Sequence, residues 1–122
     1  MKPKSSGKIC SEKLSSDFNF LLESGTFSDV KIKCGGVELE CHKVILGARS
    51  PVFNAMFAHN MTESQEKKIE IEDLDIETVR DMLKYMYAGK IENLNTRSPR
   101  LLEAADKYQL SELKEICEVR DE

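Results

Sequence analysis

Apolar residues near the start of the chain repeat at the spacing of an α-helix. They fall on one stripe between residues 12 and 24, and Gly25 follows as a helix stop. The residues of this stripe are Leu14, Phe18, Leu21 and Leu22. Phe20 lies off the stripe, so the apolar face of the predicted helix is wider than a surface helix of a monomer needs.

The pattern then changes to strict alternation and predicts a β-hairpin. In residues 30–34 apolar side chains alternate with lysines, and in residues 37–41 they alternate with glutamates. Gly35 and Gly36 stand between the two segments, and both can adopt the positive φ that a type I′ turn requires. The hairpin should bury one apolar face and present lysines opposite glutamates on the other.

Helical patterns and capping signals dominate the rest of the chain. Residues 42–48 predict a short helix, residues 59–66 a polar loop, and residues 68–72 a third strand. Four further helices are predicted where a capping residue precedes an apolar period, and their starts lie at Ser50-Pro51, Asp75, Ser98-Pro99 and Ser111. Gly89 should end the second of these four helices.

The order of the elements indicates the fold class. A helix is followed by a hairpin, two helices, a strand and three helices, so strands do not alternate with helices throughout. The sequence therefore predicts an α+β domain in which a small three-stranded sheet is capped by about six helices. Because three strands make a thin sheet, the helices must supply most of the core.

Composition excludes several classes of protein. The chain has 122 residues, 18 Lys and Arg against 22 Asp and Glu, and a net charge of −4. A nucleic-acid-binding module usually carries a clear basic excess, so this balance argues against one. No apolar run approaches the ~20 residues of a membrane span, and no secretory signal is visible. Residues 1–11 predict a flexible leader or linker, which leaves residues 12–122 as the domain.

Residues that could carry chemistry are few. His42 stands beside Cys41 and near Cys34, but no Cys-x-x-Cys pair and no nearby fourth ligand complete a zinc site. All four cysteines are expected to be reduced thiols, since no secretory signal is present. No glycine-rich phosphate loop occurs, and nothing specifies a cleft for a Cys/His nucleophile. We therefore expect no metal, no cofactor and no catalytic activity.

Five motifs in a fixed order resemble the BTB (POZ) domain family. They are SDV at 28–30, HKVIL at 42–46, RSPVFNAMF at 49–57, YMYAG at 85–89 and AADKYQL at 104–110. The resemblance covers about residues 13–120, and within the family the chain is most similar to speckle-type POZ proteins, in which a substrate-binding MATH domain precedes the BTB domain. It implies a small sheet capped by helical hairpins, usually in a homodimer, in the nucleus or the cytoplasm.

The resemblance also implies a dimer interface. Leu14, Phe18, Leu21 and Ile45 match dimer-interface positions of the family. A symmetric homodimer would bury the wide apolar stripe on a second copy of the chain, which is the commonest arrangement among oligomers. The same residues could instead belong to the intramolecular core, because a stripe at helical spacing usually does.

A role as adaptor between a substrate and a cullin ubiquitin-ligase scaffold is implied as well. Speckle-type adaptors carry a hydrophobic residue, any residue and a glutamate in the loop before the third strand, and Met61, Thr62 and Glu63 stand at that place. Met61 would insert into a groove of the cullin N-terminal domain, and Glu63 would accept hydrogen bonds there. Met61 could also fold back to anchor its own loop. Phe53 and Tyr108 are weaker candidates for the same surface, since both could be core residues.

Some features depart from the speckle-type pattern or leave alternatives open. The match ends with the predicted helix at 111–120, so it does not include the helical pair that widens the cullin interface in full-length adaptors. A lower affinity for the cullin is therefore expected. Substrate choice would lie in a domain outside this chain. Asp29 and Lys43 match a buried charged pair that zinc-finger repressors use near the dimer groove, although Asp29 could cap the strand entry and Lys43 could extend into solvent. The alternative function is a BTB dimerisation domain that recruits corepressors for a transcriptional regulator.

Overall fold

Three strands form one small sheet with β1 at its centre. The computed structural model describes residues 3–59, 68–91 and 94–120. Its strands are β1 (Val30–Cys34), β2 (Val37–Cys41) and β3 (Lys68–Glu70). β1 pairs antiparallel with β2 and parallel with β3, so the strand order is β2-β1-β3. Gly35 and Gly36 both have positive φ and form the two-residue turn between Cys34 and Val37, as predicted.

The two faces of the hairpin differ as the alternation predicts. Ile32 and Cys34 are buried on one face, whereas Lys31 and Glu38 are exposed on the other. The Glu38 carboxylate lies 3.8 Å from Nζ of Lys31 and 3.2 Å from Nζ of Lys68. The hydrogen bond from Lys68 and the positive charge of both lysines lower the pKa of the Glu38 carboxyl. Glu38 is therefore an anion at neutral pH.

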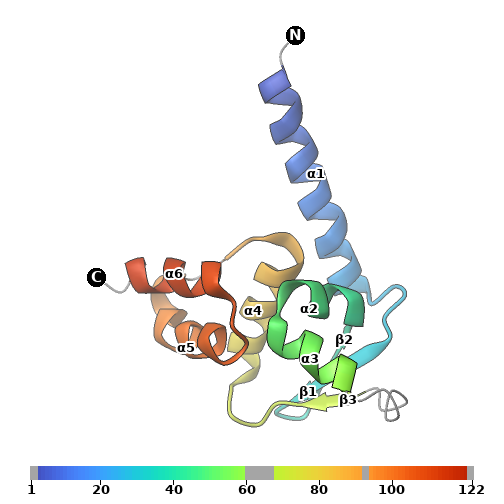
Figure 1. Ribbon diagram of the computed structural model, residues 1–122, viewed down its shortest axis with the longest axis vertical. Coiled ribbons are helices and arrows are strands. Elements are labelled where there is room, and N and C mark those ends of the chain that lie inside the picture. The colour runs from blue at the N-terminus through green and yellow to red at the C-terminus, as the bar shows by residue number, and fades with distance from the viewer. Residues whose placement is uncertain (1–2, 60–67, 92–93, 121–122) are drawn as a thin grey trace.

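The described part of the chain also contains six helices. They are α1 (Pro3–Ser24), α2 (Lys43–Arg49), α3 (Pro51–His59), α4 (Ile76–Ala88), α5 (Leu94–Lys107) and α6 (Ser111–Arg120). Figure 1 shows the α2–α3 pair and the α5–α6 pair on either side of α4, while the N-terminal part of α1 projects away from the rest. The predicted α+β architecture is confirmed. None of the helices described is long and apolar enough to cross a membrane.

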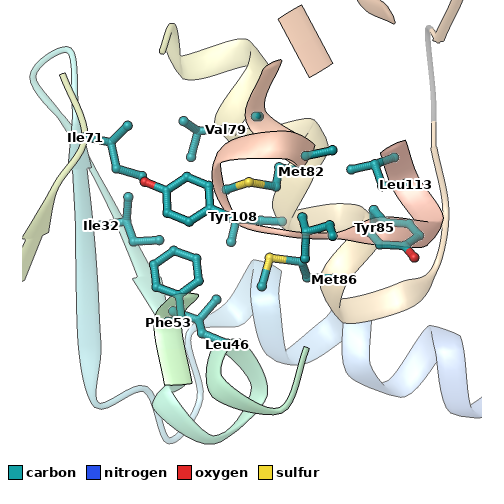
Figure 2. Packing of buried hydrophobic residues seen from close by; sticks show 14 of the residues in the cluster. Ile32, Leu46, Phe53, Ile71, Val79, Met82, Tyr85, Met86, Tyr108 and Leu113 are labelled. Carbon is teal, nitrogen blue, oxygen red and sulfur yellow. The ribbon is translucent and has the colours of Figure 1, made fainter. Parts of the chain in front are cut away.

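The core lies where the helices meet the apolar face of the sheet. Figure 2 shows the rings of Phe53 and Tyr108 at its centre, with Ile32 of β1 and Met82 of α4 beside them. The two ring centroids are 4.6 Å apart and the ring planes differ by 4°. This stacked pair joins α3 to the end of α5, so it connects the two helical pairs through the core.

The caps of α4 follow the sequence prediction. The Asp75 carboxylate accepts hydrogen bonds from the hydroxyl and from the backbone N–H of Thr78. Both bonds, the one from the hydroxyl first, lower the pKa of Asp75. Gly89 adopts φ 71° after the last turn, and its N–H donates to the Tyr85 carbonyl at 2.8 Å. Local sequence therefore fixes both ends of α4, which packs against α1, α2 and α5.

Two helix starts differ from the sequence prediction. α1 begins at Pro3, so residues 3–11, predicted as a flexible leader, continue the helix. Lysine and serine carry only small helix penalties, and extending an existing helix costs far less than nucleating one. α5 begins at Leu94 instead of at Ser98, which places Pro99 inside the helix. Pro99 is the sixth residue of this helix, where it removes one backbone hydrogen bond to the preceding turn, while the turns that follow it continue the helix.

Candidate functional site: an apolar groove between α1, α2 and α4

The rotation of α1 is fixed by its contacts with α4. The hydroxyl of Ser15 donates to the carbonyl of Ala88, at the C-terminal end of α4, over 2.6 Å. Two turns later Leu22 packs against the buried core. Because Ser15 and Leu22 lie on one side of the helix, the neighbouring side that carries Leu14 and Phe18 faces away from the core of the monomer.

An apolar groove of about 470 Å³ opens on that side. Leu14 and Phe18 of α1 form one wall, Val44 and Ile45 of α2 form the other, and buried residues of α4 such as Met86 form the floor. Leu14 is 59% exposed and Val44 is 76% exposed. Large apolar side chains that gather on one exposed face indicate a protein-interaction site. We call this surface the α1–α2–α4 groove.

The groove brings together most of the residues that the sequence proposes for a dimer interface. Leu14, Phe18 and Ile45 line it, whereas Leu21 is half-buried on α1 and lies outside the lining. Sequence reasoning missed Val44, the most exposed of the aliphatic side chains in the lining. α2 has only seven residues, so its apolar period is too short to separate the exposed Val44 from its buried neighbour Leu46.

A buried hydrogen-bond network holds α2 against α4 at the edge of the groove. The ring nitrogens of His42 lie 2.7 Å from the Tyr87 hydroxyl and 2.7 Å from the Thr26 carbonyl. Since a carbonyl only accepts, Nε2 carries a proton, and in the neutral ring the Tyr87 hydroxyl donates to Nδ1. Burial raises the pKa of Tyr87, so its hydroxyl stays protonated. His42 therefore has a structural role, since its hydrogen bonds connect the start of α2 to α4 and to the loop at Thr26. Among the described residues no group of metal ligands occurs around His42 or elsewhere.

Asp29 acts as a cap for α2. Its carboxylate accepts a hydrogen bond from the backbone N–H of Lys43 at 2.8 Å, at the first residue of the helix. The residue in the N-cap position, His42, provides no side-chain cap, so the neighbouring loop supplies one. The Lys43 ammonium lies 5.8 Å from the centroid of the Phe57 ring instead of extending freely into solvent.

The residues proposed for cullin binding fall into two groups. Met61 and Glu63 lie outside the residues that the structure describes. Phe53 is fully buried and Tyr108 nearly so, because their stacked rings form the centre of the core. Their side chains do not reach the surface of the described chain. The core alternative therefore describes Phe53 and Tyr108, and neither is retained as a contact residue.

Comparison with known proteins decides the family. The model of the BTB/POZ domain family matches residues 18–120. The chain belongs to the BTB/POZ family. Among solved structures it is similar to the BTB domain of zebrafish PATZ1, with a TM-score of 0.77 and 27% identity, over 88% of this chain and 87% of that chain. It is also similar to the BTB (Tramtrack and Bric a brac) domain of human gigaxonin, with a TM-score of 0.69 and 26% identity, over 96% and 91% of the two chains.

Membership of this family gives the coarse function. A BTB domain is a protein-interaction and dimerisation module, and such domains are generally non-catalytic. The geometry of this BTB domain fits that description, because an apolar groove with exposed walls lies between its helices and its His42 side chain is used in structural hydrogen bonds.

Three cysteines of this BTB domain, Cys34, Cys41 and Cys117, have buried side chains. Cys34, Cys41 and Cys117 form no disulfide with one another. Burial raises the pKa of Cys41 to about 12 from an ordinary value of 9.0, and it also raises the pKa of Cys34. The Cys34 thiol donates to the carbonyl of Leu74 at 3.2 Å. Thiols in this environment are protonated at neutral pH and act as small apolar core residues.

We expect these three thiols to resist alkylation in the folded protein. The pKa rise at Cys41 lowers its thiolate fraction at pH 8 by a factor of about a thousand, and burial also blocks the reagent. Iodoacetamide labelling at pH 8, followed by peptide mass mapping, measures this directly. The same protein in guanidinium chloride serves as the control and should label at all four cysteines. Equal labelling rates for Cys41 in the folded and unfolded chain would contradict the prediction.

Proposed function

We propose that this BTB domain is a homodimeric adaptor of the speckle type, which links a substrate receptor outside this chain to a cullin-based ubiquitin ligase. The proposal of a dimer is supported by the α1–α2–α4 groove with its exposed apolar walls. The cullin contact rests on the sequence at residues 61–63. The similarities to the domains of zebrafish PATZ1 and human gigaxonin, at 27% and 26% identity, favour neither an adaptor nor a corepressor-recruiting function.

The proposed dimer pairs the groove of one copy with that of a second copy across a two-fold axis. In such an interface the same patch occurs on both copies. The side chains of Leu14, Phe18 and Ile45 would therefore be buried on each copy, with Leu21 at the margin. Burying a leucine or phenylalanine side chain contributes about 1.5–3 kcal/mol. Leu14 is 59% exposed in the single chain, so its burial on each copy would supply a large part of such a contribution.

The residues proposed to contact the cullin follow α3 in the sequence. Ser50, which precedes α3, donates its hydroxyl to the Tyr108 carbonyl at 2.8 Å and accepts from the Phe53 N–H at 3.2 Å. Phe53 stacks on Tyr108 from inside the same helix. The helix that leads into residues 60–67 is therefore anchored on the core. A rigid support of this kind favours precise placement of a contact segment.

We expect Met61→Ala to weaken binding of the cullin N-terminal domain about thirty-fold, because the anchor loses buried methylene equivalents of about 2 kcal/mol. Glu63→Lys should weaken it at least as much, since it reverses a charge at the interface edge. Isothermal titration calorimetry of each variant with the cullin domain measures the change. Thr62→Ala is the matched control and should bind like the wild type, because Thr62 occupies the position that accepts any residue.

Two outcomes would contradict parts of this proposal. If the wild type binds and both variants bind equally well, the cullin contact lies elsewhere on the domain. If the wild type shows no binding at micromolar concentrations, in this chain and in a longer chain that adds the following helical pair, the adaptor function is excluded. The corepressor-recruiting function would then be favoured. The proposed dimer is tested separately, by the mass of the wild type and its variants in solution.

A further inference from the structure

A second cleft, of about 580 Å³, lies beside the free edge of the sheet. Its walls are the C-terminal end of α1 at residues 22–25, strand β2 at residues 38–40, and one side of α4 with Arg80, Leu83 and Lys84. No residue lines both this cleft and the α1–α2–α4 groove. Dimerisation through the groove therefore does not use it. We call this site the β2 cleft.

The backbone of β2 is available for pairing on its cleft side. β2 is an edge strand, since β1 is its only neighbour in the sheet described. The residues that flank a two-residue hairpin turn exchange hydrogen bonds, and bonded and non-bonded pairs then alternate along the ladder. Cys34 and Val37 flank the turn, so Glu38 and Glu40 direct their N–H and C=O groups away from β1. These are the groups that an added strand uses.

The cleft also has an apolar floor on the core side of β2. Leu22, Leu39 and Leu83 meet there, one from each wall. Leu39 is only half-buried, although Ile32 directly opposite it on β1 is fully buried. The apolar face of the sheet is thus incompletely covered at its edge. One apolar side chain of an added strand, pointing to the core side, would complete that cover.

The charged residues along the β2 edge determine which kind of strand can pair with it. Glu38 and Glu40 alternate with Leu39, and their register partners on β1 are the two lysines of the lysine–isoleucine–lysine run at 31–33. The Glu40 carboxylate also accepts a hydrogen bond from the Ser28 hydroxyl at 3.3 Å. A strand added on the other side of β2 meets the same two glutamates, so it also needs basic residues on its outer face. A second copy of β2 would place glutamate opposite glutamate, which disfavours pairing between two copies of this edge.

We propose that the β2 cleft binds an extended segment of another protein, in which two basic residues flank one apolar residue, as a fourth strand antiparallel to β2. The basic side chains face Glu38 and Glu40, and the apolar side chain enters the pocket formed by Leu22, Leu39 and Leu83. Arg80 and Lys84 line the core-side wall, so the next inward-facing positions of the segment are uncharged or acidic.

Fluorescence anisotropy with blocked, labelled nine-residue peptides tests this proposal on the whole chain. The probe carries lysine–isoleucine–lysine between threonines, and its control carries glutamate–isoleucine–glutamate. We expect the lysine peptide to bind below millimolar concentration and the glutamate peptide to bind at least tenfold more weakly. The double variant Glu38→Gln, Glu40→Gln should weaken the lysine peptide by about tenfold, since it removes both cross-strand charge pairs.

Backbone methylation separates strand addition from simple charge attraction. In an antiparallel pair the residues opposite Glu38 and Glu40 bond to β2, so N-methyl groups on the two lysine amides should abolish binding. An N-methyl group on the isoleucine amide, which points away from β2, should leave binding unchanged. Amide exchange measured by NMR should slow at Glu38 and Glu40 when the unmodified peptide is added.

Several results would overturn the proposal. They are failure of the lysine peptide to bind below millimolar concentration, equal binding of the glutamate peptide, equal binding after lysine N-methylation, and slowed exchange in the α1–α2–α4 groove instead of at β2. Concentration-dependent self-association that protects Glu38 and Glu40 without peptide would assign the edge to a second copy of the chain, which also contradicts it. None of these results bears on the cullin contact.

Discussion

The double variant Leu14→Asp, Phe18→Asp is expected to be a folded monomer under conditions where the wild type is a dimer. Both side chains line the α1–α2–α4 groove and are exposed in the single chain, so the substitutions leave the core unchanged. In the proposed dimer each would bury an unpaired carboxylate, which costs several kcal/mol. Size-exclusion chromatography with light scattering gives the mass, and circular dichroism confirms that the fold is retained.

Phe20→Asp provides the matched control for this experiment. Phe20 is on the same helix and is 62% exposed, but it does not line the groove. The substitution should leave the dimer intact. A wild-type chain that sediments as a monomer at tens of micromolar, which corresponds to an association free energy of about −6 kcal/mol or weaker, would contradict the proposed interface. Equal loss of the dimer in Phe20→Asp would show that a different face of α1 is used.

Phe53→Ala is expected to lower the free energy of unfolding by about 3–5 kcal/mol. Phe53 is 0% exposed and contributes one ring of the stack with Tyr108, so its removal leaves a cavity at the centre of the core. A loss of this size is a large fraction of the stability of a domain, which is about 5–15 kcal/mol in total. Urea unfolding monitored by circular dichroism measures it.

The same substitution at an exposed phenylalanine controls for the change of residue type. Phe27 is 89% exposed in the loop before β1, and Phe27→Ala should change the free energy of unfolding by no more than about 0.5 kcal/mol. Tyr108→Phe keeps the stacked ring and should cost far less than Phe53→Ala. A loss below about 1 kcal/mol for Phe53→Ala would mean that the core closes around the missing ring.

Local signals in the sequence were sufficient for the elements that they encode directly. The alternation in residues 30–41 and the pair Gly35-Gly36 specify the hairpin, its register and its charged face without any distant contact. Asp75 and Gly89 mark the ends of α4 because capping depends on residues within one turn of the helix end. Such features involve neighbours in the chain, so a single sequence contains them.

Features that depend on distant contacts could not be read in the same way. Nothing local indicates that β3 pairs in parallel with β1. The stack of Phe53 on Tyr108 joins residues 55 positions apart, which is why both could be considered surface candidates from sequence. The contact of His42 with Tyr87 likewise becomes visible only in three dimensions. For the groove, the apolar stripe on α1 indicated the surface, and the structure added Val44 from α2.

The central position of β1 has a consequence for the order of folding. β1 meets β2 across a two-residue turn, and hairpins of this kind form in about 1–10 µs. Pairing with β3 must instead bring Ile32 to Ile69, with α2 and α3 in between, and the closure of so long a loop costs entropy before any contact compensates it. We therefore expect amides of the β1–β2 hairpin to gain protection before Ile71, whose N–H donates to Lys33 across the β1–β3 pair. Pulse-labelled hydrogen exchange during refolding would detect this order, and simultaneous protection of both sides of β1 would show that the sheet assembles in one step.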